Sequence, residues 1–170
     1  MSNATPFDPE RLITALDAHG VRYVLIGALA ARLQGFPRVT ADADITPARD
    51  PENLARLADA LRDLGARVYT ESVPEGLPYD WDARALGRGE MWNLITEAGR
   101  LDLIFSPAGG LDFDALLPAA VEFEVYGTTL HAADLSDIMR LKEAADRPQD
   151  RQDVVVLREM IRRREDHSPG

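Results

Sequence analysis

The chain has 170 residues, of which 45% are hydrophobic and 28% charged, and it carries a net charge of −10. These values predict one globular domain over residues 1–170 and argue against a disordered chain. The negative charge argues against a protein that coats nucleic acid electrostatically, although it does not exclude a local basic pocket. The absence of cysteine excludes disulfides and thiolate metal sites and is compatible with a cytoplasmic protein. No apolar run approaches the roughly 20 residues of a membrane span, so we expect no membrane partner.

The first half of the chain alternates helix and strand signals. An aspartate followed by a proline begins each of two helices, because the aspartate side chain caps free N–H groups and proline fits the first helical turn. A short β-rich run, "RYVLI", precedes a glycine and then helix-forming residues. The elements expected in this half are a helix from Asp8 to Gly20, a strand over 22–26, a helix over 28–34, a strand that carries Asp42 and Asp44, a helix over 50–65 and a strand over 67–71.

The second half holds an irregular stretch, two hairpins and two closing helices. Residues 71–90 mix proline, glycine and charge without a steady period, so we expect a long loop with one helical turn. Short connections predict antiparallel hairpins between "MWNLIT" and "RLDLIF" and around Gly127. Helices are expected over 134–146 and 148–165. Together these elements predict an α/β (α+β) fold, in which helices flank a small mixed sheet and the C-terminal helices close a cleft.

Three aspartates, Asp42, Asp44 and Asp102, fall within predicted strands. Successive strand side chains point to opposite faces, so Asp42 and Asp44 share one face and lie about 7 Å apart. Asp102 points away from Leu101 and Leu103 by the same alternation. Hard carboxylate oxygens suit Mg²⁺, and two such ions could activate an attacking oxygen and stabilise a leaving one in phosphoryl-type transfer. Each aspartate also has a structural interpretation, as a solvated strand end, a helix cap or the exposed face of a hairpin.

Gly27 separates a predicted strand from a predicted helix. The missing side chain and the free N–H groups of the helix start would favour an anion such as phosphate at this position. A plain turn is the structural alternative. The order of glycine, paired aspartates and third aspartate is therefore more informative than any one of them.

The string "VLIGALAARLQGFPRVTADADI", followed later by "GRLDLIF", resembles the nucleotidyltransferase superfamily of DNA polymerase beta and kanamycin nucleotidyltransferase. The pattern is a glycine pair or Gly-Ser, a short helix, Asp-x-Asp and a third aspartate on a later strand. The nearest branch by resemblance is that of the AbiEii-like proteins, many of them toxins of bacterial toxin–antitoxin pairs. That branch shares the Arg-x-Thr-x-Asp-x-Asp string and a C-terminal motif that is similar to "LKEAADRPQDRQDVVVL". The likeness extends from about residue 22 to residue 158.

The resemblance implies a fold, an activity and a set of site residues. The activity is Mg²⁺-dependent transfer of a nucleoside monophosphate from an NTP to an acceptor, with two metal ions. Structural roles remain open for several residues, since Arg38 and Thr40 could lead a strand at the surface, and Asp150 and Asp153 could simply favour a helix start. The implied roles are metal binding by Asp42, Asp44 and Asp102, proton acceptance by Asp102, phosphate binding by Gly27, Ala28 and Lys142, contact with the triphosphate by Arg38 and Thr40, and a place near the site for Arg147, Asp150 and Asp153.

The acceptor stays open at this point. The toxin branch implies RNA, such as the 3′ end of tRNA, or a protein hydroxyl, together with an antitoxin partner, whereas the antibiotic-modifying branch implies a small molecule. Ala28 stands where the family has glycine or serine, so a non-catalytic NTP-binding sensor is a second hypothesis. The arginines at 162–164 are the most obvious place for RNA to bind, although a solvated helix end explains them better. "DADIT" also matches a phosphatase motif, but the apolar strand that normally precedes that motif is missing here.

Overall fold

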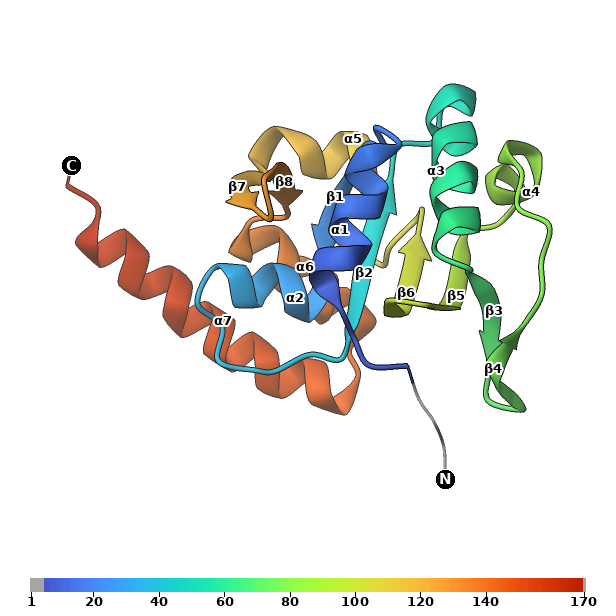
Figure 1. Cartoon of the computed structure of the whole chain (residues 1–170). Helices are drawn as coiled ribbons and strands as arrows, with labels where there is room; N and C mark the ends of the chain where they lie inside the picture. The colour runs from blue at the N-terminus through green and yellow to red at the C-terminus, as the bar shows by residue number, and fades with distance from the viewer. Residues whose placement is uncertain (1–4, 170) are drawn as a thin grey trace.

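The computed structural model describes residues 5–169. Eight strands form one mixed sheet in the order β4-β3-β5-β6-β2-β1-β8-β7 (Figure 1). The strands are β1 (Tyr23–Ile26), β2 (Asp42–Pro47), β3 (Arg67–Thr70), β4 (Val73–Leu77), β5 (Met91–Thr96), β6 (Gly99–Ile104), β7 (Val121–Val125) and β8 (Thr128–Ala132). The helices are α1 (Pro9–Ala18), α2 (Gly27–Leu33), α3 (Pro51–Asp63), α4 (Ala83–Arg88), α5 (Phe113–Leu116), the 3₁₀ helix η1 (Leu117–Ala119), α6 (Leu135–Ala145) and α7 (Pro148–His167). The predicted α/β class with a mixed sheet is confirmed.

The predicted helix starts are also confirmed. The side chain of Asp8 accepts a hydrogen bond from the backbone N–H of Arg11, and that of Asp50 accepts one from the backbone N–H of Asn53, both at 3.0 Å. A proline occupies the first turn of both α1 and α3. The two helices pack against each other, as Figure 1 shows. Local capping chemistry therefore sets where these helices begin.

The expectation of a long loop over 71–90 is wrong at residues 73–77, whereas the helical turn expected within it is present. Residues 73–77 form β4, which pairs with β3 at the edge of the sheet, and residues 83–88 form α4. The strand was not predicted, because Pro74 and Gly76 are residues that usually break strands. An edge strand tolerates proline, since one side of it makes no ladder hydrogen bonds. Gly76 has a φ of 87°, and a Cβ there would lie 2.5 Å from the Ile95 side chain, so the close approach of β5 requires glycine.

The centre of the sheet places four side chains in one row. Ile26 of β1 pairs with Asp44 of the antiparallel β2, Asp44 pairs with Asp102 of the parallel β6, and Asp102 pairs with Asn93 of the antiparallel β5. Residues directly opposite on neighbouring strands point to the same face. On the other face the side chains are apolar and buried, namely Ala43, Ile45, Leu94, Leu101 and Leu103. The alternation predicted from the sequence therefore holds, and it leaves one polar face at the middle of the sheet.

The C-terminal helices lie beside this polar face. α6 packs against both α2 and α7, and α7 runs out to the C-terminus at the left of Figure 1. Asp146 joins α6 to α7 in the left-handed conformation, with a φ of 50°. This sharp connection brings the start of α7 back toward the sheet. Among the described residues, none of the helices has the length and apolar character that a membrane crossing requires.

Candidate active site

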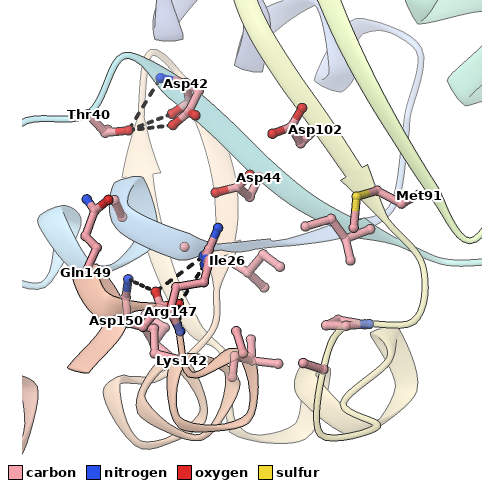
Figure 2. Close-up of a pocket in the computed structure, with 18 of the residues that line it drawn as sticks. Ile26, Thr40, Asp42, Asp44, Met91, Asp102, Lys142, Arg147, Gln149 and Asp150 are labelled. Atoms are coloured by element: carbon pink, nitrogen blue, oxygen red, sulfur yellow. Dashed lines mark hydrogen bonds and ion pairs between the residues drawn. The ribbon is translucent and has the colours of Figure 1, made fainter. Parts of the chain in front are cut away.

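A cavity of about 630 Å³ lies between the polar face of the sheet and the C-terminal helices. Asp42, Asp44 and Asp102 line it from β2 and β6, and Lys142 lines it from α6. Figure 2 shows the three carboxylates on the sheet, with Lys142, Arg147 and Asp150 on the other side of the cavity. The cavity thus joins residues that are more than 100 positions apart in the chain.

Gly27 has a structural role toward Asp44. Its φ is 71°, and a Cβ at this position would lie 2.3 Å from Oδ2 of Asp44. A left-handed backbone conformation favours glycine, and the close approach of the carboxylate excludes any larger residue without movement. The space left by the missing side chain is therefore taken by Asp44, which lies directly against the start of α2.

Burial and mutual repulsion disfavour the charged forms of two of these carboxylates. Burial, together with the charges of Asp42 and Asp102, raises the pKa of Asp44 to about 7. Burial also raises the pKa of Asp102, and the charge of Arg100 opposes this shift. One oxygen of Asp102, Oδ1, is buried and accepts no hydrogen bond from the described residues; the nearest cation is Nη2 of Arg100 at 3.6 Å. Such crowded, poorly partnered carboxylates are stabilised by a bound cation.

Thr40 orients the remaining carboxylate. Its hydroxyl lies 2.8 Å from Oδ1 and 3.1 Å from the backbone carbonyl oxygen of Asp42 (Figure 2). The contact fixes the first residue of β2 at the cavity. Thr40 therefore lies in the site as a partner of Asp42.

The residues fit a magnesium site that substrate completes. Among residues 5–169, no three histidine or acidic side chains enclose a metal by themselves. Mg²⁺ usually takes one or two carboxylates and fills its other positions with water and substrate phosphates. The unpartnered oxygen of Asp102 and the raised pKa of Asp44 are the observations that favour a cation here.

A second group of charges, which we term the α7 ion-pair cluster, consists of Arg38, Lys142, Arg147, Asp150 and Asp153. Nη1 of Arg38 donates to both oxygens of Asp153, at 2.9 and 2.7 Å. Nζ of Lys142 lies 2.8 Å from Asp153 and 3.4 Å from Asp150. Nε of Arg147 donates to Asp150 at 2.7 Å. Two buried aspartates, one helical turn apart, therefore hold three cations that come from three different segments.

The cluster favours the charged form of Asp150. Burial opposes the charged form of Asp150, but its hydrogen bonds and ion pairs with Arg147 and Lys142 prevail and lower its pKa. Only 2% of Asp150 and 6% of Asp153 is exposed, so neither carboxylate is a solvated helix end. Asp150 also completes a capping box with Arg147 at the start of α7. The structure thus gives these two aspartates a definite function in holding α7 against the cavity.

The structure brings together all the residues that the sequence singled out for the site, apart from Asp153, which lies behind the cavity lining and holds Arg38 and Lys142. The sequence interpretation missed Met91 and Asn93, which line the cavity from β5. The signal was present in the predicted hairpin, because its register places Asn93 directly opposite Asp102. The lining residues predicted from the sequence are Gly27, Ala28, Arg38, Thr40, Asp42, Asp44, Asp102, Lys142, Arg147 and Asp150.

The arginines at 162–164 are already engaged within the chain. Arg162 pairs with Glu159 and Asp166, and Arg163 pairs with Glu159. Arg164 donates to the backbone carbonyl of Gln34 at 2.7 Å. These contacts support the interpretation of this stretch as a solvated helix end.

The fold is that of nucleotidyltransferases. The lincosamide antibiotic adenylyltransferase LnuA, solved with lincomycin bound, is similar to this chain with a TM-score of 0.56 and 16% identity, over 91% of this chain and 99% of that one. TM1012 from Thermotoga maritima, a candidate nucleotidyltransferase, is similar with a TM-score of 0.50 and 15% identity, over 96% of this chain and 99% of that one. No family model and no curated protein matches the sequence.

Proposed function

We propose that the protein is a Mg²⁺-dependent nucleotidyltransferase, which moves a nucleoside monophosphate from an NTP to a hydroxyl of an acceptor and releases pyrophosphate. One observation carries the proposal: Asp42, Asp44 and Asp102 converge from two neighbouring strands on a cavity that also holds Lys142 and Arg147. The nucleotidyltransferase fold supports it. Carboxylates on one side and cations on the other match a metal-bound triphosphate.

The carboxylates would hold the metal ions and receive the acceptor. Asp42 and Asp44 would be ligands, with Thr40 and Gly27 fixing their positions. Bound Mg²⁺ would neutralise the phosphates and stabilise the attacking and leaving oxygens. The raised pKa of Asp102 suits it to accept the proton of the acceptor hydroxyl.

The cations would neutralise the triphosphate. Lys142 has three donors and keeps capacity beyond its contacts with the two aspartates. The side chain of Arg147 is 74% exposed, so Nη1 would bind phosphate oxygens while Nε and Nη2 stay on Asp150. Arg38, which Asp153 holds at the cavity, would also bind phosphate oxygens. Ala28 offers only its backbone N–H, so phosphate contact at the start of α2 would rest on the main chain.

The finer assignment follows from the sequence resemblance. Membership of the AbiEii-like branch would imply RNA, tRNA or a protein hydroxyl as the acceptor and an antitoxin protein as the partner. The similarity of the fold to the solved structure of an antibiotic adenylyltransferase supports a small-molecule acceptor instead. An NTP substrate is consistent with a cytoplasmic enzyme.

The test is label transfer by the purified protein. The wild type is incubated with each α-labelled NTP, Mg²⁺, and separate pools of total tRNA, cell protein and small molecules. Asp42→Ala/Asp44→Ala is the inactive comparison, and Asp114→Ala, an exposed aspartate elsewhere, is the matched control. Label transfer by the wild type and by Asp114→Ala, but not by Asp42→Ala/Asp44→Ala, supports the proposal. NTP binding without transfer to any pool favours the non-catalytic sensor.

A further inference from the structure

The cavity is divided by charge into two halves. On one side Arg38, Lys142 and Arg147 face it from the α7 ion-pair cluster, and the aspartates of β2 and β6 lie between. On the far side of the aspartates lies Met91, as Figure 2 shows.

The far wall is uncharged beyond Asp102. In the β5–β6 pairing, Asn93 stands opposite Asp102 and Met91 stands opposite Ile104, so all four share one face. All four line the cavity, and Ser106 and Pro107 continue the wall after β6. Arg100 is the next residue on this face, but its guanidinium stacks over the Tyr69 ring at 3.7 Å and faces Asp102. The wall therefore presents apolar surface and neutral hydrogen-bonding groups.

Met91 is an unusual residue for a solvent-facing wall. It is 56% exposed, although a long apolar side chain gains free energy when it is covered. Met side chains are flexible and adapt to apolar ligands of irregular shape. Asn93 is also exposed and stands beside the aspartate that would receive the acceptor hydroxyl, where its carboxamide offers both donors and an acceptor.

We propose that this uncharged wall, formed by Met91, Asn93 and Ile104, binds the acceptor, and that the acceptor is an uncharged small molecule with an apolar portion and at least one hydroxyl. The inference rests on the proposed nucleotidyl transfer and specifies its second substrate. Met91 and Ile104 cover the apolar portion. Asn93 bonds a polar group next to the reacting hydroxyl, which faces Asp102.

The other acceptor classes do not match this wall. A polyanion such as tRNA would require cations on this wall, whereas Arg38, Lys142 and Arg147 lie on the other side of the cavity, where they would bind the triphosphate, and the chain is strongly acidic overall. A polycationic sugar requires several carboxylates, whereas this wall offers Asp102, whose charge Arg100 already opposes.

Binding to the wall is measured on Met91 itself, so the result does not depend on catalysis. The wild type is labelled with ¹³C-methyl methionine, saturated with Mg²⁺ and a non-hydrolysable NTP analogue, and titrated with four probes. Chloramphenicol and octyl glucoside below its micelle concentration are uncharged and carry hydroxyls; kanamycin is the cationic probe, and bulk tRNA is the anionic one. We expect the uncharged probes to shift the Met91 methyl signal in a saturable way.

Variants distinguish a specific site from non-specific hydrophobic binding. Met91→Ala should lower the affinity for the uncharged probe about tenfold and leave the affinity for the NTP analogue unchanged. Fluorescence competition measures both affinities. Val155→Ala, at an exposed apolar residue of α7, is the control for Met91→Ala. Asn93→Asp should weaken the binding of the uncharged probe and strengthen the binding of kanamycin. Gln152→Glu adds the same charge elsewhere and should change neither affinity.

Two results would overturn the inference. One is that tRNA or kanamycin shifts the wild-type Met91 signal more strongly than both uncharged probes. The other is that neither uncharged probe shifts it at all. Failure of the proposed transfer itself would be seen separately, in the label-transfer assay, as no transfer from any α-labelled NTP to any pool.

Discussion

Asp44 and Asp102 lie on the sheet side of the cavity and Asp150 lies on the helix side, and their surroundings shift the pKa values of these carboxyls in opposite directions. Asp44 and Asp102 lie beside other carboxylates, and burial raises the pKa of both. Asp150 is more deeply buried, yet Arg147 and Lys142 lower its pKa. Burial alone therefore does not identify a functional carboxylate. The difference lies in the partners: Asp150 has two cations within contact distance, whereas Asp44 faces two other carboxylates and Asp102 has only the longer contact with Arg100.

The largest expected effect is a loss of activity without a loss of stability when Asp44 of the sheet is replaced. Asp44→Ala should lower nucleotidyl transfer by about a thousandfold, because it removes a metal ligand that contributes to the transition state. The same change should not lower thermal stability in the absence of metal. Transfer assays and melting curves on one preparation test both statements. A variant that fails to fold would mean that Asp44 is structural and would remove the contrast.

The next effect is on stability, on the helix side. Asp153→Ala leaves Arg38 without its buried partner and leaves Lys142 with only the longer contact to Asp150, and it should cost about 3 kcal/mol in the free energy of unfolding. Asp166→Ala, which removes an exposed partner of Arg162, is the control. Urea denaturation measures both variants. Equal, small losses would contradict the structural role of the α7 ion-pair cluster.

The pH dependence of stability sharpens the comparison. In metal-free protein the pKa of Asp44 rises from 3.8 to about 7 on folding, so its contribution is full below pH 4 and is lost as the pH rises through 7. Asp44→Asn has no such loss, and its advantage over the wild type should grow between pH 4 and pH 8, by about 4 kcal/mol. Asp150 behaves in the opposite sense, because its pKa is lowered and its contribution disappears at acid pH. Denaturation with a chelator present, at several pH values, checks the trend; a constant difference would show that Asp44 is ionised throughout.

The smallest effect concerns the surface. Glu159 contacts Arg162 and Arg163 on the exposed side of α7. Exposed ion pairs of this kind contribute little, since water and salt screen them. Glu159→Gln should therefore give no change that a melting curve resolves. If the variant also bound tRNA more tightly than the wild type, the arginines at 162–164 would have to be reconsidered as an RNA contact.

Sequence reasoning predicted what depends on local chemistry. Helix caps, strand alternation and hairpin turns follow from neighbouring residues, and these predictions are confirmed at Asp8, Asp50 and Gly127. The sequence also indicated which residues meet at the cavity. It did not predict β4, because Pro74 and Gly76 usually break strands and only the edge position accommodates them. Nor did it show that Asp153 holds Arg38, since that contact depends on the packing of α7 against a distant loop.

The contact between Arg38 and Asp153 joins residues 115 positions apart. A chain still being synthesised reaches its three carboxylates and their strands before α7 has left the ribosome. At that stage Arg38 and Lys142 lack the aspartates that hold them at the cavity. The proposed nucleotide binding would therefore begin only after α7 has been synthesised and has packed at the cavity, so the order of the elements along the chain delays it.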